Sequence, residues 1–202
     1  MVRLLNIPGG KPRPDVPILG SRPPRPDEIV MLSQPVLRAV IKVGESLRGV
    51  HAKWGIDGDA GEIMKGVNVH TEIIEILTTE EGTDEICSAM AEYRSLPPAV
   101  VEQKLDREAD VDGKLLPVYI KSYYAELTVN GVKVKVLGDE QIKVGEWEWG
   151  DALDFEPEYV YVVGERVPVV PLRLKSELDL GLGWLDRVEL ISDAVMRSMH
   201  RH

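Results

Sequence analysis

An Asn-Gly pair between two runs of alternating apolar residues is the feature that most constrains the fold of this chain. The runs cover residues 118–129 and 132–137, and Asn130-Gly131 joins them. A type I′ turn needs positive φ at both central residues, which Asn and Gly adopt readily, so this pattern is a strong short-range signal for a β-hairpin. Every second residue of the second run is Val, which places a β-branched stripe on one face of that strand. The chain must therefore contain a β-sheet.

The pattern around the hairpin predicts further helices and strands. In chain order, these are a helix (28–49), a short strand (52–56), a tight turn (58–61), a short helix (62–65), a buried strand (72–78), a helix (84–93), a loop with some helix (95–112), two short strands (160–163 and 167–170) and a helical segment broken near residue 182 (172–199). This order predicts an α/β (α+β) fold in which a mixed sheet is flanked by helices.

Prolines separate the beginning of the chain from the rest. They stand at positions 8, 12, 14, 17, 23, 24 and 26, with Arg and Lys between them. Pro removes backbone donors and fixes φ, so residues 1–28 are expected to form an extended arm, part polyproline II. The arm either holds a ligand or a subunit, or it is a loosely ordered tail, which is the plainer interpretation. Residues 29–202 are expected to form one domain whose C-terminal helices begin at about residue 172.

Composition excludes several classes of protein. The net charge of −10 argues against general nucleic-acid binding, which needs concentrated Lys and Arg. Cys87 is the only cysteine, so the chain can form neither an intrachain disulfide nor a zinc site of cysteine type. No run approaches 18 apolar residues, and no signal peptide is recognisable. These features favour a cytoplasmic protein without a membrane segment.

Five short segments, in this order, resemble motifs of the nucleotidyltransferase superfamily, the polymerase-β-like minimal fold. They are Trp-Gly-Ile-Asp-Gly-Asp (54–59), Lys-Gly-Val (65–67), Glu-Ile-Leu-Thr (75–78), Gly-Val-Lys-Val-Lys-Val-Leu-Gly-Asp (131–139) and Gly-Trp-Leu-Asp-Arg-Val (183–188). The first resembles the Gly-rich turn before a short helix, the third the end of the strand that carries Asp-x-Asp, and the fourth the neighbouring strand with a third acid. The resemblance covers about residues 36–195.

The resemblance implies a two-metal chemistry. Such proteins move an NMP from an NTP onto an acceptor, and two Mg²⁺ ions brace the attacking and leaving oxygens. Mg²⁺ demands oxygen ligands, and residues two apart on a strand point the same way, so Asp-x-Asp presents two carboxylates on one face. The Gly-rich turn lets backbone N–H groups approach the triphosphate.

This chain departs from the pattern at the acids. The Asp-x-Asp pair maps onto Ile73 and Glu75, and the third acid maps onto Lys135. A lysine there would repel Mg²⁺ and could pair with Glu75 instead. Asp59 adds negative charge where a triphosphate would lie. The sequence therefore predicts a protein that has lost ordinary two-metal catalysis and serves as a nucleotide-binding or protein-interaction module. This hypothesis expects no cluster of two or more carboxylates facing the cleft beneath Gly58.

Two other functions stay open. In an active Mg²⁺-dependent nucleotidyltransferase, Glu75 and Asp59 would be catalytic, and Glu75 with Asp57 or Asp59 would hold the metal. Joint use of Glu72 and Glu75 would need a β-bulge, because a spacing of three puts them on opposite faces. In the other function, suggested by analogy, the chain is a structural or antitoxin-like partner subunit, or part of a homo-oligomer.

The expected nucleotide contacts are the same for the binding module and for the enzyme. They come from Gly58, Asp59, Lys65 and Lys135. The expected ligand is an NTP, and Mg²⁺ is expected only for an active enzyme.

Overall fold

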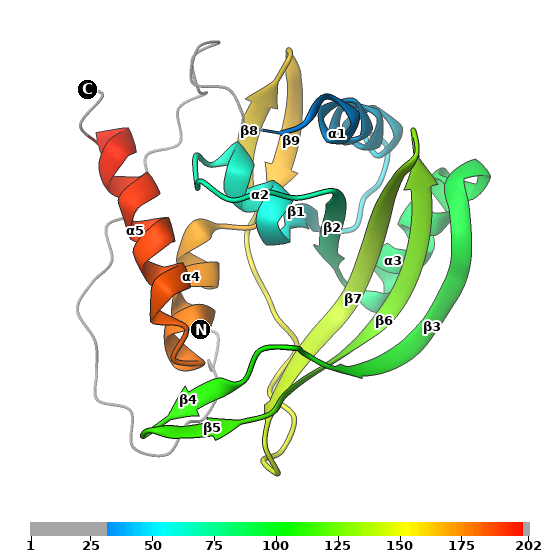
Figure 1. Ribbon diagram of the computed structural model, residues 1–202. Helices are drawn as coiled ribbons and strands as arrows, with labels where there is room; N and C mark the ends of the chain where they lie inside the picture. The colour runs from blue at the N-terminus through cyan, green and yellow to red at the C-terminus, as the bar shows by residue number, and fades with distance from the viewer. Residues whose placement is uncertain (1–31, 200–202) are drawn as a thin grey trace.

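A computed structural model describes residues 32–199, so the predicted arm at residues 1–28 lies outside the described residues. Figure 1 labels the helices and strands of the described residues. The helices are α1 (Gln34–Ser46), α2 (Gly58–Met64), α3 (Glu80–Ala89), a 3₁₀ turn (Ala91–Tyr93), α4 (Leu172–Gly181) and α5 (Leu185–Met199). The strands are β1 (Trp54–Asp57), β2 (Ile73–Thr78), β3 (Arg94–Lys104), β4 (Ala109–Val111), β5 (Lys114–Leu116), β6 (Val118–Val129), β7 (Val132–Val144), β8 (Glu158–Val162) and β9 (Glu165–Val169).

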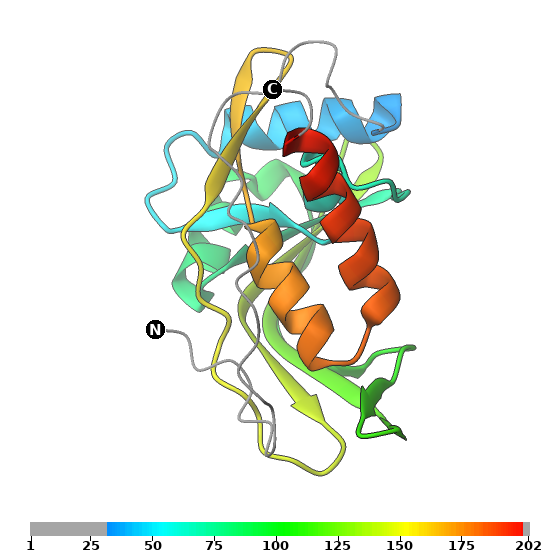
Figure 2. The same ribbon diagram turned by 90° about the vertical axis from the view of Figure 1, so that its left-hand side faces the viewer.

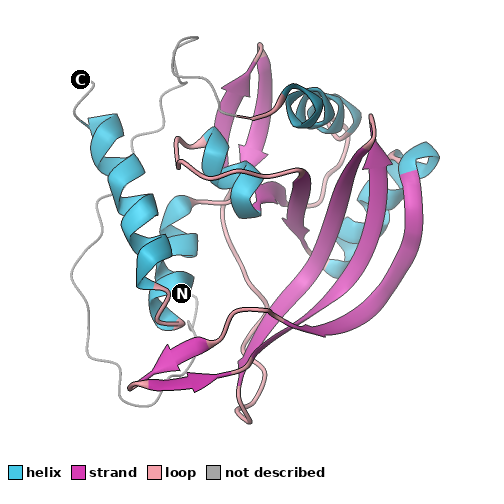
Figure 3. Cartoon of the chain, in the orientation of Figure 1, coloured by secondary structure: helices cyan, strands magenta, loops and turns pink. Residues whose placement is uncertain are grey.

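A seven-stranded mixed sheet forms the centre of the fold, in the order β3-β6-β7-β2-β1-β9-β8. The pairs β2–β7 and β1–β9 are parallel, and the other pairs are antiparallel. The predicted hairpin is confirmed: β6 and β7 meet at Asn130 and Gly131, which have φ of 52° and 79°. Figure 3 shows β3, β6 and β7 as the long, curved part of the sheet.

Helices cover both faces of the sheet (Figures 1 and 2). On one face, α1 and α3 pack against inward side chains of the strands, such as Ile74 and Val134. On the other face, Leu174 of α4 packs in a second cluster with Leu77 and Leu137. The α4 face also carries Asp57, Glu75 and Lys135, which lie in register on β1, β2 and β7. Among the described residues, no helix combines the length and apolar composition needed to cross a membrane.

The prediction of a loop with some helix at residues 95–112 is wrong. Residues 94–104 form β3, an edge strand that pairs with β6 in regular register from Ala99 to Lys104 and with register shifts between Arg94 and Ala99, where the two prolines lie. Pro97 and Pro98 suggested a break in the chain, but proline is tolerated on an edge strand, where one side of the backbone has no partner. The run from Ala99 to Val101 then supplies β-forming residues.

Two helices begin earlier than predicted. The expected turn at 58–61 is the first part of α2, which begins directly at Gly58. The next helix, α3, begins at Glu80 rather than at Asp84, because the Thr79 hydroxyl accepts a hydrogen bond from the Gly82 N–H and caps the helix.

Candidate functional site

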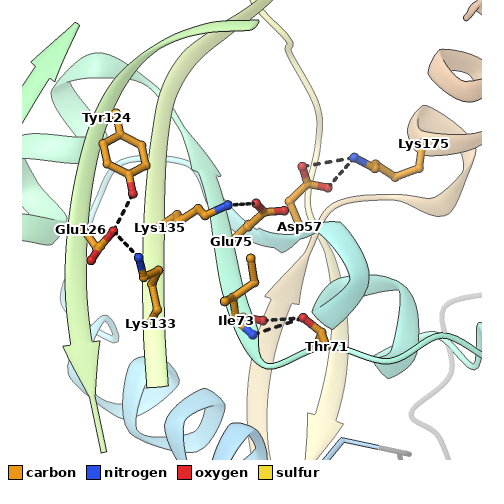
Figure 4. Close-up of polar contacts among 9 residues, drawn as sticks. All are labelled: Asp57, Thr71, Ile73, Glu75, Tyr124, Glu126, Lys133, Lys135 and Lys175. Atoms are coloured by element: carbon orange, nitrogen blue, oxygen red, sulfur yellow. Dashed lines mark hydrogen bonds and ion pairs between the residues drawn. The ribbon is translucent and has the colours of Figure 1, made fainter. Parts of the chain in front are cut away.

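Three charged residues lie side by side on the α4 face of the sheet. Asp57, the last residue of β1, pairs in register with Glu75 of β2, and Glu75 pairs in register with Lys135 of β7. Directly opposite residues on neighbouring strands project to the same face, so the three side chains form a row across the sheet (Figure 4). The register thus places Lys135 beside Glu75, where the resemblance calls for a third acid.

Lysines neutralise both carboxylates of this row. The Lys135 ammonium donates to Glu75 Oε1 across 3.0 Å. From α4, the Lys175 ammonium lies 3.2 Å and 3.4 Å from the two oxygens of Asp57. Asp57 is 4% exposed, so its pair with Lys175 is shielded from water. Although burial opposes the charge of Lys175, the neighbouring Asp57 and Glu140 hold its pKa above the ordinary value.

Gly58 permits the close approach of α2 to β2. Its φ is +59°, a region that L side chains rarely adopt. A Cβ at this position would lie 2.2 Å from Glu75 Oε2. The Gly-rich turn that the resemblance picks out therefore brings the start of α2 against the Glu75 carboxylate.

Arg187 of α5 forms a second charged cluster with α2. Its guanidinium donates to Asp59 Oδ1 at 2.9 Å and to Glu62 Oε2 at 2.6 Å. The neighbouring Asp186 pairs with Arg107 rather than with Arg187. Adjacent residues at a helix start point in different directions, so each reaches a different neighbour.

A cavity of about 290 Å³ lies between the two clusters. Five carboxylates line it, from Asp57, Asp59, Glu62, Glu75 and Asp179. The expectation that no two carboxylates would face the cleft beneath Gly58 is therefore wrong. The motifs did not include Glu62 and Asp179, which reach the cleft from the helices.

Burial changes the titration of the acids in and near this cavity. Burial raises the pKa of Glu62 to about 7, although Arg187 and Lys175 oppose the shift. Burial likewise raises the pKa of Glu140, which lies in β7 close to Asp57, to about 7. The pKa of Asp179 is raised for the same reason. In each case the low-dielectric surroundings disfavour the charged form.

The acids of the cavity do not converge on one point in the described part of the chain. Among residues 32–199, no group of three or more His, Cys, Asp or Glu side chains has an arrangement that could hold a metal ion. Two of the oxygen ligands that Mg²⁺ would need, Asp57 and Glu75, already pair with ammonium groups. Ile73 contributes an apolar side chain to the cavity wall at the first acid position.

The structure brings together most of the predicted site residues. Gly58, Asp57, Asp59 and Glu75 all line the cavity, and Lys135 reaches its edge through Glu75. Lys65 does not line the cavity, because it pairs with Glu158 of β8. Burial lowers the pKa of Lys65 to about 8, because it disfavours the charged ammonium.

Sequence reasoning missed the contribution of α4. Lys175 and Asp179 stand one helical turn apart, so both face the sheet. A charged residue that is buried on a helix is unusual unless it is paired. Arg173 and Glu177 stand at the same spacing on the exposed side of the helix, so the sequence alone did not single out Lys175 and Asp179.

Comparisons with known proteins bear on the fold. No protein-family model matches the chain, and no curated protein matches it. Among solved structures, the chain is similar to the crystal structure of a candidate nucleotidyltransferase from Thermotoga maritima. The TM-score is 0.61 and the identity 24%, over 86% of this chain and 98% of that chain. With the mixed sheet and its flanking helices, this similarity shows that the chain has a nucleotidyltransferase-like fold.

Proposed function

We propose that this chain is a nucleotidyltransferase-fold protein that does not transfer nucleotides by the two-metal route, and that its cleft is a metal-independent binding site. The observation that carries the proposal is the pair of lysines on the two strand carboxylates. Lys135 holds Glu75 and Lys175 holds Asp57, at 3.0 Å and 3.2 Å.

Charge repulsion from the two lysines opposes a metal ion at this place. Two unit charges at 4 Å interact by about 4 kcal/mol at an effective dielectric constant near 20, so a divalent ion at that distance from an ammonium is repelled by about 8 kcal/mol. Displacing Lys175 would leave its buried ammonium without Asp57, its closest partner. Mg²⁺ would thus have to break existing ion pairs to reach its ligands.

The fold makes nucleotides the first ligands to test. Calorimetric titration with ATP, GTP, CTP and UTP, each with and without Mg²⁺, separates the alternatives. We expect Mg²⁺ to strengthen none of the four titrations and no pyrophosphate to be released. Mg²⁺-dependent binding of any nucleotide would contradict the proposal. If no nucleotide binds at all, the binding module must recognise another class of ligand or a protein partner.

One observation favours an active enzyme as the second candidate function. Asp57 and Glu75 lie directly opposite each other on β1 and β2, so two carboxylates do share one face. Asp59 is a weaker candidate for the metal site, because Arg187 already binds it. Incubation with each α-³²P-labelled NTP, Mg²⁺ and a candidate acceptor tests this function. Release of pyrophosphate that is lost in Glu75→Gln would support an enzyme.

A further inference from the structure

Three buried carboxylate oxygens of the cavity have no hydrogen-bond donor among the described residues. They are Asp57 Oδ1, Glu62 Oε1 and Asp179 Oδ2. Asp57 Oδ1 lies near the Lys175 ammonium, although this contact does not have the geometry of a hydrogen bond. Asp179 is the clearest case, because it is only 6% exposed and lines the cavity.

Such atoms call for a partner. A buried acceptor without a donor costs about 1–3 kcal/mol, and more when it is charged. Folded proteins retain few of them, and many of those that remain bind a ligand, an ion or a water molecule. The two cations that line the cavity, Lys175 and Arg187, already pair with Asp57, Asp59 and Glu62, and neither donates to Asp179.

We infer that the cavity binds an organic cation with N–H donors, of the alkylammonium or guanidinium class, held by Asp179 and the free oxygen of Glu62. The inference rests on the proposed function, in which the cleft is a binding site. It adds the charge and the chemistry of the ligand.

The charge of the cavity wall selects a cation. Five carboxylates and two cations line the cavity and Lys135 pairs with Glu75 at its edge, which leaves a negative surplus when Glu62 and Asp179 are ionised. A triphosphate without Mg²⁺ would bring several negative charges against this surplus, whereas an ammonium or guanidinium group reduces it. Charge-assisted hydrogen bonds to carboxylates are also stronger than neutral ones, and a guanidinium supplies up to five donors.

Shape and neighbouring groups agree with this ligand class. The volume of about 290 Å³ is at the small end of ligand pockets, which suits a small molecule. Trp184 closes one side, and its indole N–H donates to the Glu108 carbonyl at 2.7 Å, which fixes the ring. An aromatic face is a favourable wall for a cation, as the Arg107 guanidinium 4.9 Å from the Trp184 ring centre already illustrates.

A metal ion is the competing occupant. It would need several oxygen ligands converging on one point, and no such group occurs among residues 32–199. A hydrogen-bonding cation needs only donors that reach separate acceptors, which fits oxygens that come from α2 and α4.

The test is calorimetric titration of the full chain with agmatine, which carries one guanidinium and one ammonium group. N-Butylurea serves as the neutral probe of similar shape. We expect saturable binding of agmatine, no binding of N-butylurea, and at least tenfold weaker agmatine binding in Asp179→Asn and in Glu62→Gln, since each substitution removes a charged acceptor. Glu72→Gln is the matched control, because Glu72 is an exposed acid outside the cavity, and this variant should bind like the wild type.

Three results would overturn the inference. These are no agmatine binding by the wild type, equal binding by Asp179→Asn and the wild type, or displacement of agmatine by lower concentrations of Mg²⁺ than of n-butylammonium, which carries N–H donors. Thermal unfolding of each variant shows whether it is folded, and the comparison of agmatine with N-butylurea needs no variant. If agmatine does not bind and Mg²⁺ leaves the nucleotide titrations unchanged, only the inferred ligand class is wrong. Mg²⁺-dependent nucleotide binding would instead contradict the proposed function.

Discussion

The ammonium of Lys135 lies 3.0 Å from Glu75 Oε1, between side chains that stand directly opposite each other on the parallel strands β7 and β2. In the nucleotidyltransferase pattern that the sequence resembles, two carboxylates and a metal ion would occupy this place. Here the lysine supplies the positive charge from the protein itself. The pair is a little more than one-quarter exposed on each side, so its main consequence is for ligand choice rather than for stability.

Gly58→Ala should destabilise the fold. The new Cβ would lie 2.2 Å from Glu75 Oε2, and φ is +59°. Moving the Glu75 side chain and forcing alanine into this backbone region together cost about 2–4 kcal/mol. Urea unfolding followed by circular dichroism measures the change.

Gly66→Ala is the matched control for this substitution. Its φ is +89°, but nothing lies within 4 Å of the added Cβ. It should lose only the backbone contribution, about 1 kcal/mol. Equal losses in the two variants would show that the contact with Glu75 is unimportant.

Arg187→Met should destabilise the chain by about 3 kcal/mol. The substitution leaves Glu62, which is 2% exposed at its side chain, without its only hydrogen-bond donor among the described residues. Removing one partner of a buried ion pair typically costs about 3–5 kcal/mol, and protonation of Glu62 would recover a part of this. The substitution should therefore lower the free energy of unfolding less at pH 5 than at pH 8.

A surface ion pair supplies the comparison for Arg187. Arg48 binds Glu165 at 2.5 Å, yet its side chain is 65% exposed. Arg48→Met should lower the free energy of unfolding much less than Arg187→Met does, because water screens an exposed pair. A loss as large as that of Arg187→Met would argue that burial does not set the strength of these pairs.

Stability should decrease as the pH rises toward neutrality. Burial raises the pKa of Glu140 from 4.5 to about 7, so the folded chain holds its proton more tightly than the unfolded chain does. The contribution of Glu140 to the free energy of unfolding is largest below pH 4.5, falls as the pH rises to about 7 and is constant above that pH. Glu62 contributes in the same direction over the same range.

Glu140→Gln should remove much of this pH dependence. At pH 8 it should raise the free energy of unfolding by about 2 kcal/mol, since one pKa unit corresponds to about 1.4 kcal/mol. Urea unfolding at pH 5, 6.5 and 8 measures the slope. A slope that is unchanged in the variant would mean that another group titrates.

The sequence predicted the elements whose signals are local. Asn130 and Gly131 need no tertiary context to favour a hairpin turn, and the alternating valines of β7 define its faces. The strand β3 was not predicted, because its pairing with β6 is a tertiary contact and Pro97-Pro98 suggested a break. The start of α3 depends on the cap from Thr79 and was placed four residues too late.

Part of the cleft could also be expected from sequence. Glu75 and Lys135 were placed together because they map onto the second and third acid positions of the nucleotidyltransferase resemblance; strand periodicity alone does not fix which strands are neighbours. Lys175 and Asp179 could not be placed there, because about one hundred residues separate them from β2 and only the packing of α4 brings them to it. The burial that shifts the titration of Glu62 likewise depends on α5, which is distant in the chain.

The most direct test of the central claim is Mg²⁺ binding by the wild type and by Ile73→Asp/Lys135→Asp. The double substitution restores carboxylates beside Glu75, and Ile73→Asn/Lys135→Asn is the uncharged control. Calorimetric titration with Mg²⁺, with and without ATP, should show no Mg²⁺ binding by the wild type or the control and clear binding by the Asp variant. Mg²⁺ binding by the wild type that is as strong as in the Asp variant would contradict the account, because the lysines would then not have replaced the metal.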